Sequence, residues 1–474
     1  MSVLANLFKY QKIPLLFILL SSLFYVSFAY DLVRTDITKL VLLYMALFVF
    51  AYQIIKTSGF NFKLLVISAI AFRLLFLFAI PNLSQDFHRF IWDGRMILEG
   101  LNPYLYTPNS FILNGKFPIN QAQELYNGMG ALSSSHFTNY PPLNQLCFSI
   151  AALFSGKSIL GSVVVLRTII IAADIGTLYF GKKLLERLKL PSNRIFWYIL
   201  NPFIIIELTG NLHFEGVMIF FLFWSLYLLH SGKWKWAAII FACSISVKLI
   251  PLMFLPLFFW WFTSTSISYQ TSTSLGEQNK KIKKRIIDFI GMRRLISFYL
   301  IIGFTILILF LPFFSMDFIN NYSQTVGLWF GKFEFNASIY YIVREIGFTI
   351  TGYNEIAIIA KVLPIISLLI ILGFSFFKKN DTIPKLTTSI LLAFTCYLFL
   401  STTVHPWYIA TLVMLCLFTN YRFPIIWSVA LVLSYLAYSN SANSENLWII
   451  GLEYVIVFTA FIWEVFILKQ NRLQ

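Results

Sequence analysis

A polar segment at residues 84–104, SQDFHRFIWDGRMILEGLNPY, directly follows a long apolar run. Asp86 and Asp93 are seven residues apart with Arg89 between them, so the three side chains would share one face of a helix. A carboxylate within hydrogen-bond reach of a hydroxyl can remove its proton. The segment therefore offers two candidate general bases, Asp86 and Asp93, and a cation that could orient them. An ion-pair stripe on a helix surface is the alternative.

Further polar residues that could bind a substrate stand beside apolar runs later in the chain. They are Tyr140 in YPPL, Asn211, His213 and Glu215 in GNLHFEG, Lys248 in SVKLIP, and His405 in VHPWY. Each has a plain alternative role, because prolines stiffen turns, histidines occur in loops, and a Lys near the membrane surface can extend its ammonium into water. A Lys that stays within an apolar run needs an anion, and a lipid phosphate would suit it.

Composition identifies the surroundings in which these residues work. Of the 474 residues, 58% are hydrophobic and 12% are charged, and the mean hydropathy is +0.76. Soluble domains carry roughly 25% charged residues, and apolar runs of about 20 residues can cross a bilayer. We therefore predict a single all-α polytopic integral membrane domain over residues 1–474, with about 14 transmembrane helices (12–14). The predicted runs are 14–30, 38–55, 62–81, 158–180, 195–208, 216–230, 236–249, 250–262, 296–312, 355–377, 386–404, 406–420, 424–438 and 447–468.

The distribution of basic residues predicts the orientation. With the N-terminus in the cytoplasm, most of the 36 Lys and Arg residues fall in cytoplasmic segments, as the positive-inside rule expects, and the C-terminus is cytoplasmic too. This orientation requires residues 144–155 to lie at the outer face without crossing. The net charge of +16 then reflects topology and not a nucleic-acid partner. The segment 264–294 is Ser/Thr-rich and then Lys-rich, which predicts a basic, flexible cytoplasmic loop.

In this orientation the candidate residues gather on the external face. The first long external loop, 82–143, contains the acidic segment and Tyr140 and is predicted to form interfacial helices. The remaining candidates fall at the external ends of spans. This convergence predicts a site outside the cytoplasm that can meet a lipid-borne substrate, in a multi-pass protein of a cell membrane. The style of the chain suggests a bacterial inner membrane.

Taken in order, six motifs resemble those of a known family: D-x-x-R-F-x-W-D-G, G-x-N-P-Y, Y-P-P-L, N-P…E…G-N-x-H-x-E, V-K-L-x-P and H-P-W-Y. The set is similar to the polyprenyl-phosphate-sugar-dependent glycosyltransferases of the GT-C superfamily, in particular the bacterial mannosyltransferase-like branch, over about residues 82–408. The resemblance implies a GT-C-like membrane hexosyltransferase. Such an enzyme moves one sugar, here mannose or another hexose, from a lipid-phosphate carrier to an acceptor glycan or lipid outside the cytoplasm, commonly with inversion.

The resemblance also implies roles for the candidate residues. Asp86 would be the general base, Asp93 a supporting acid or acceptor contact, and Arg89 the residue that orients the carboxylates. The substrate-binding residues would be Lys248, His405 and His213 at the donor phosphate, Glu215 and Asn211 at sugar hydroxyls, and Tyr140. Two departures from the family pattern are visible: two extra spans precede the acidic loop, and that loop has no Asp-x-Asp pair. Because the loop has no Asp-x-Asp pair, no metal is expected, and no other cofactor is expected either. The implied partners are the polyprenyl-phosphate-linked sugar donor, a glycan or lipid acceptor and membrane lipids.

Two other classes of protein remain open at this point. A lipid-linked glycan polymerase or ligase would also act outside the cytoplasm, but its functional loop usually comes later in the chain. A glycan or lipid transporter would line the bilayer midplane with polar residues, whereas here they gather at one face. The chain has no Gly-rich phosphate-binding loop followed by Lys-Ser/Thr, which argues against a nucleotide-driven role.

Overall fold

The computed structural model describes residues 11–58, 61–269, 282–331, 333–439 and 444–468. In this part of the chain, seven helices are long and apolar enough to cross a membrane. An eighth span results if the bent pair Pro202–Gly210 and Glu215–His230 is counted as one. The prediction of an all-α polytopic membrane protein is confirmed. All of the predicted runs fall on helical segments. The runs outside these seven or eight spans form helices that are short or interrupted, so a total of about 14 spans stays a prediction.

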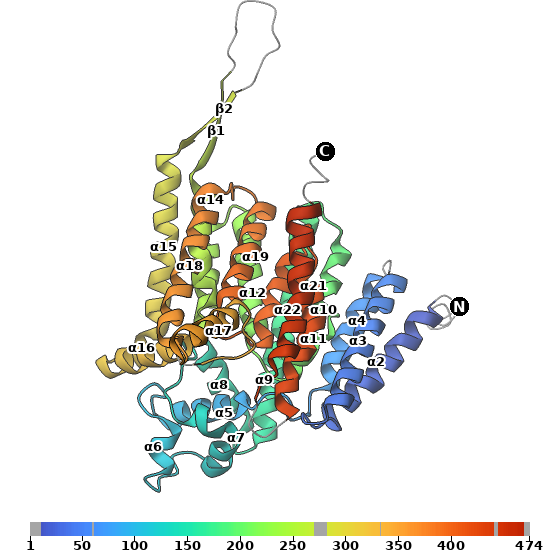
Figure 1. Ribbon diagram of the computed structural model, residues 1–474, viewed down its shortest axis with the longest axis vertical. Helices are drawn as coiled ribbons and strands as arrows, with labels where there is room; N and C mark the ends of the chain where they lie inside the picture. Colours follow the sequence, from blue (N-terminus) through green and yellow to red (C-terminus); the bar gives the residue numbers. More distant parts are fainter. Residues whose placement is uncertain (1–10, 59–60, 270–281, 332, 440–443, 469–474) are drawn as a thin grey trace, which may run out of the picture.

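The helices follow one another through the bundle with few strands between them (Figure 1). The long apolar helices are α2 (Lys12–Tyr30), α3 (Ile37–Ser58), α9 (Ile159–Arg187), α15 (Phe289–Phe310), α18 (Ile356–Phe377), α19 (Ile383–Leu400) and α22 (Leu447–Ile462). The shorter ones are α4 (Phe62–Leu75), α5 (Asp86–Leu98), α6 (Pro108–Ile112), α7 (Ala122–Ser134), α8 (Pro142–Ser155), α10 (Phe196–Ile199), α11 (Pro202–Ile204), α12 (Glu215–His230), α13 (Trp234–Val247), α14 (Phe259–Thr263), α16 (Met316–Gly331), α17 (Ile339–Thr351), α20 (Ile409–Cys416) and α21 (Phe423–Ala430). Tighter or wider turns form η1 (Ser192–Ile195), η2 (Ile205–Gly210), η3 (Ile250–Phe258), η4 (Leu311–Phe313), η5 (Pro406–Tyr408), η6 (Leu431–Ser439) and η7 (Trp463–Ile467).

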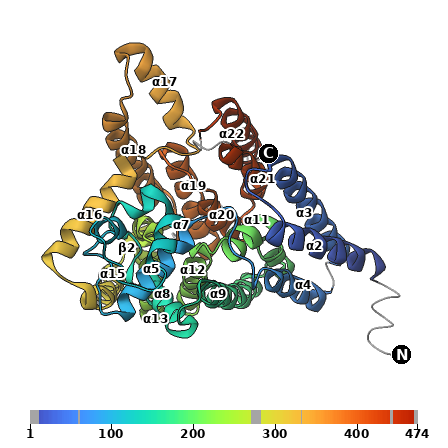
Figure 2. The ribbon, with the colours of Figure 1, turned by 90° about the horizontal axis from the view of Figure 1, so that it is seen from below.

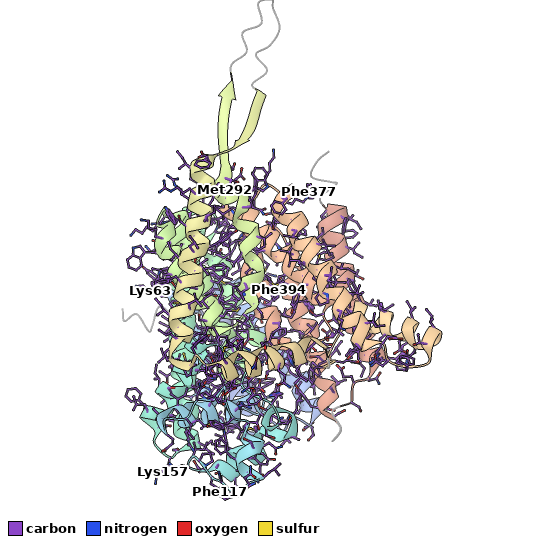
Figure 3. All side chains as sticks on the ribbon, turned by 90° about the vertical axis from the view of Figure 1, so that its left-hand side faces the viewer. Lys63, Phe117, Lys157, Met292, Phe377 and Phe394 are labelled. Atoms are coloured by element: carbon purple, nitrogen blue, oxygen red, sulfur yellow. The ribbon has the colours of Figure 1, made fainter. Side chains whose placement is uncertain are left out.

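Opposite ends of the bundle carry different structures. Helices α5 to α8 lie at one end, and the hairpin of β1 (Ser264–Tyr269) and β2 (Ile282–Ile287) projects from the other (Figure 1). Figure 3 likewise places Phe117 and Lys157 at one end, with Met292 and Phe377 at the other. The predicted flexible loop 264–294 thus contains two paired strands and the start of α15, while its residues 270–281 lie outside the described residues. Its cytoplasmic side stays a prediction.

A close approach of α5 and α8 explains the glycine in the W-D-G motif. A Cβ atom on Gly94 would lie 2.2 Å from the backbone oxygen of Phe148 on α8. Because no larger residue fits there, Gly94 allows the two helices to touch, and the rings of Phe90 and Phe148 stack beside it at 4.6 Å between centroids. Seen from this end of the molecule, α16 lies at one edge of the bundle and the pair α2–α3 at the opposite edge (Figure 2).

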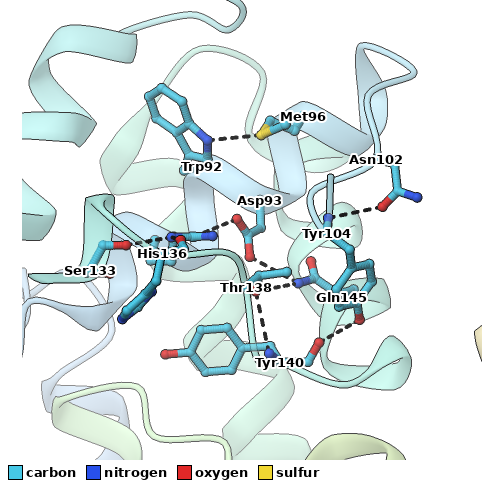
Figure 4. Close-up of polar contacts among 11 residues, drawn as sticks. Trp92, Asp93, Met96, Asn102, Tyr104, Ser133, His136, Thr138, Tyr140 and Gln145 are labelled. Carbon is cyan, nitrogen blue, oxygen red and sulfur yellow. Dashed lines mark hydrogen bonds and ion pairs between the residues drawn. The ribbon is translucent and has the colours of Figure 1, made fainter. Parts of the chain in front are cut away.

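The N-P-Y motif at residues 102–104 joins the loop after α5 to other parts of the chain. The Asn102 side chain accepts a hydrogen bond from the Tyr104 amide at 3.0 Å and donates one to the Phe313 carbonyl at 3.1 Å. The Tyr104 hydroxyl donates to the Tyr140 carbonyl at 2.6 Å (Figure 4). This motif therefore has a structural role, since it fixes the segment that carries Tyr140.

Two helix breaks bring polar residues to the α5–α8 end of the bundle. Helix α13 ends at Val247, and Lys248 has an extended backbone before Pro251, whose missing N–H prevents the helix from continuing. The pair Pro202–Gly210 and Glu215–His230 bends by 112°, and Leu212 in the bend has a positive φ of 63°. Because a broken helix leaves backbone groups unpaired, polar side chains are tolerated there within an apolar bundle.

Candidate active site

A cavity of about 1250 Å³ opens at the α5–α8 end of the bundle. It is larger than the roughly 300–1,000 Å³ of ordinary small-molecule pockets, so it has room for two substrates. The predicted site residues that line it are Asp86, Arg89, Tyr140, Lys248 and His405. The structure places the others, Asp93, Asn211, His213 and Glu215, behind the cavity wall, where they are buried.

Asp86 is the first residue of α5 and faces the cavity. Within the described residues its carboxylate makes no hydrogen bond or ion pair, so both oxygens are available to a ligand. Burial raises the pKa of Asp86 from 3.8 to about 6, while Lys248 lowers it and Glu215 raises it further. Asp86 is therefore ionised near neutral pH and basic enough to accept a proton from a hydroxyl.

Asp93 lies in different surroundings although it shares the helix with Asp86. It is fully buried, and its oxygens accept hydrogen bonds from Arg89 Nε at 2.8 Å and Gln145 Nε2 at 3.0 Å. Arg89 Nη1 in turn donates to the carbonyls of Ser133 and His136 at 2.6 and 3.0 Å (Figure 4). Asp93 and Arg89 thus hold α5 against the loop that follows α7, and Asp93 does not reach the cavity.

Lys248 contributes a positive charge to the cavity wall. Its ammonium lies 2.9 Å from Glu215 Oε1, and the side chain of Glu215 has no exposed surface, whereas that of Lys248 is 21% exposed. The same ammonium lies 5.6 Å from the ring centroid of Tyr140. The buried carboxylate and the aromatic ring fix the ammonium at the surface of the cavity, where an anionic group can approach it.

The histidines of the G-N-x-H-x-E and H-P-W-Y motifs both stack on one tryptophan. The Trp407 ring stacks on His405 at 4.5 Å between centroids and on His213 at 3.6 Å. His405 lines the cavity, and burial followed by the charge of Lys248 lowers its pKa to about 3, so it is neutral at pH 7. A neutral imidazole can still donate one hydrogen bond to an anion.

His213 and Asn211 form a buried support behind this stack. His213 Nε2 lies 3.4 Å from Glu207 Oε2, and Asn211 donates to Glu207 Oε1 at 3.0 Å. The Asn211 oxygen accepts a hydrogen bond from the Leu83 amide at 3.2 Å. Since Leu83 directly precedes the acidic segment, this network connects the bend in the α11–α12 region to the start of α5.

Several cavity residues carry charges that the motifs did not indicate. Arg344 on α17 pairs with Glu334, and the Tyr341 hydroxyl donates to Glu445. Arg34, between α2 and α3, also lines the cavity. The amphipathic pattern SIYYIVREIG at 338–347 indicated a helix at the interface, but no local signal placed its Arg in a site. Among the described residues no group of three His, Cys, Asp or Glu side chains is placed to hold a metal ion, and metal independence stays a prediction.

Comparison with known protein families gives an independent identification. Residues 18–264 match the family model described as alpha-(1->6)-mannopyranosyltransferase, N-terminal domain. A comparison with curated protein sequences gives no match. The matched part is more than half of the chain and contains α5, the bend at 211–214 and Lys248. The chain therefore belongs to this mannosyltransferase family and is a membrane glycosyltransferase, as its resemblance to the GT-C enzymes implied.

Proposed function

We propose that this glycosyltransferase moves a single mannosyl residue from a polyprenyl-phosphate donor to an acceptor glycan or lipid on the extracytoplasmic face, with Asp86 as the general base. The observation that carries the proposal is the Asp86 carboxylate, which lines the cavity without a protein partner among the described residues. Lys248 lines the same cavity and supplies the opposite charge. A base and a cation in one cavity are what a displacement with an anionic leaving group requires.

The groups of this cavity account for the proton that is removed and for the charge that forms on the leaving group. Asp86 accepts the proton of the acceptor hydroxyl as the acceptor oxygen forms a bond to the anomeric carbon of mannose. The bond between that carbon and the phosphate oxygen breaks, and the polyprenyl phosphate leaves with the electron pair. Lys248 stabilises the charge that grows on the phosphate, and neutral His405 donates a hydrogen bond to it. One displacement inverts the configuration at the anomeric carbon.

The wall beside Lys248 supports a lipid-linked donor. Leu249, Ile250, Leu252 and Met253 follow Lys248 in the chain and line the cavity with it. An isoprenoid chain is apolar and gains free energy when it leaves water for such a wall. A phosphate at Lys248 would therefore place the lipid chain of the donor against apolar side chains, whereas a nucleotide donor would find no such complement.

The acceptor, the linkage and the membrane side also belong to the proposal. The printed family description names an alpha-(1->6) linkage, which we propose for this chain. The distribution of Lys and Arg supports cytoplasmic termini and an extracytoplasmic cavity. The family match favours a mannosyltransferase over both the polymerase or ligase and the transporter.

The test is mannosyl transfer by the purified protein in nanodiscs. Radiolabelled polyprenyl-phosphate-mannose is supplied with a mannan-containing acceptor extract, and GDP-mannose replaces the donor in a parallel reaction. We expect label in the acceptor with the lipid donor alone. Transfer from GDP-mannose and not from the lipid donor would contradict the donor class. In a separate assay with the protein in sealed vesicles, movement of the lipid donor across the bilayer without mannosyl transfer would contradict the proposed reaction.

A further inference from the structure

Arg34 lies in the turn between α2 and α3 and lines the cavity. The Asn82 side chain holds this turn in place by donating hydrogen bonds to the carbonyls of Phe28 at 2.7 Å and Leu32 at 3.2 Å. Asn82 stands four residues before Asp86, so the segment that carries the acidic helix also anchors the end of α2. The extra N-terminal helix pair is thereby joined to the cavity at a fixed position.

Arg34 differs from the other cations around the cavity in its ion pairing. Lys248 pairs with Glu215, Arg89 with Asp93, and Arg344 with Glu334. Arg34 has no anionic partner among the described residues, and its guanidinium carbon lies 5.4 Å from the ring centroid of Tyr438. A cation–π contact at a partly exposed site is weak and does not neutralise the charge. A guanidinium in this state is suited to an anionic ligand.

Aromatic contacts connect Arg34 with His405, one of the residues proposed to hold the donor phosphate. The Tyr438 ring lies 6.4 Å from Phe335, and the Phe335 ring lies 5.5 Å from His405, each between centroids. Tyr438, Phe335 and His405 all line the cavity. Arg34 thus faces the same space as His405, and the contacts that connect the two residues run through the rings of Tyr438 and Phe335.

We propose that Arg34 binds a phosphate group of a substrate at a second anion position in the cavity; this rests on the proposed function. The planar guanidinium presents paired N–H donors that match two phosphate oxygens, which an ammonium cannot do. The phosphate belongs either to the donor or to a lipid-linked acceptor. In both cases the α2–α3 pair contributes to substrate binding through one residue.

The test compares Arg34→Gln and Arg34→Lys with the wild type. Lys39→Gln is the matched control, because Lys39 belongs to the same helix pair, bonds to Asp31 and does not line the cavity. Steady-state transfer is measured with each substrate varied in turn, and binding of a short-chain polyprenyl phosphate is measured separately without any transfer. Melting temperatures establish that each variant folds.

A charge-assisted hydrogen bond contributes about 1.5–3 kcal/mol, so the KM of one substrate should rise roughly 10- to 100-fold in Arg34→Gln, with kcat changed less. Arg34→Lys should recover part of the loss, and Lys39→Gln should match the wild type. A rise for the donor, with weaker polyprenyl phosphate binding, assigns the donor phosphate; a rise for the acceptor alone assigns the acceptor phosphate. Unchanged KM values and unchanged binding in Arg34→Gln would overturn the inference, while transfer by the wild type would leave the proposed function standing.

Discussion

The pH dependence of transfer should report the ionisation of Asp86. Burial raises the pKa of Asp86 to about 6, and the base must be ionised to accept the proton of the acceptor hydroxyl. At pH 7 roughly nine tenths of the carboxylates are ionised, and at pH 5 roughly one in eleven is. We therefore expect kcat/KM to fall about 10-fold between pH 7 and pH 5, with a midpoint near 6.

Neighbouring charges should move that midpoint in opposite directions. Glu215 raises the pKa of Asp86, so Glu215→Gln should shift the acid limb to lower pH. Lys248 lowers the pKa of Asp86, so Lys248→Met should shift the limb to higher pH in addition to weakening donor binding. The assay is initial-rate transfer from polyprenyl-phosphate-mannose in nanodiscs over pH 4.5–8.5, with enzyme stability checked at each pH.

The control for this profile is Asp317→Asn, because Asp317 is exposed on α16 and lies outside the cavity. It should give the wild-type curve. The residual rate of Asp86→Asn should not vary between pH 5 and 8. An acid limb with a midpoint near 4, or one that persists unchanged in Asp86→Asn, would refute the assignment of the titrating base to Asp86.

Three further predictions concern stability and packing. The folded-state pKa of Asp86 is raised above its unfolded value, so its favourable contribution to stability is present below pH 3.8 and is lost as pH rises through 6. At pH 7 Asp86→Asn should therefore be more stable than the wild type by up to about 3 kcal/mol, and thermal unfolding should show a higher melting temperature. Lys248→Met leaves the buried Glu215 carboxylate unpaired and should cost about 3–5 kcal/mol in thermal unfolding assays, and adding Glu215→Gln should restore most of it; a double variant no more stable than the single one would contradict this. Gly94→Ala forces a Cβ against the Phe148 carbonyl and should lower stability by about 1–3 kcal/mol or more, whereas Gly303→Ala, which meets nothing within 4 Å, should not.

Hydropathy predicted the membrane class and the positions of the apolar helical segments, because a bilayer requires apolar side chains wherever the chain crosses it. It did not predict how the helices break. At the 112° bend of residues 211–214, Asn211 contacts Glu207, four residues earlier, and Leu83, which comes from a distant part of the chain. The hairpin β1–β2 lies in a Ser/Thr- and Lys-rich segment whose composition is typical of a flexible loop.

The candidate site could be predicted in part from the positions of the motifs relative to the apolar runs. Motifs at the ends of helices on one face had to meet, and Asp86, Lys248 and His405 do line one cavity. Spacing alone could not separate Asp86 from Asp93, because both share a helix face and only the bonds of Asp93 to Arg89 and to Gln145 on α8 keep it out of the cavity. Arg34, Glu334, Arg344 and Glu445 also line the cavity but belong to no motif, so nothing in the local sequence indicated their position.

Single-turnover transfer by Asp86→Asn measures whether Asp86 removes the acceptor proton. Both substrates are held at saturation, so that the chemical step is measured apart from binding, and Asp317→Asn serves as the control. We expect a roughly 100- to 10,000-fold slower step in Asp86→Asn, with donor affinity retained. A single-turnover rate within a few-fold of the wild type would show that Asp86 is not the base.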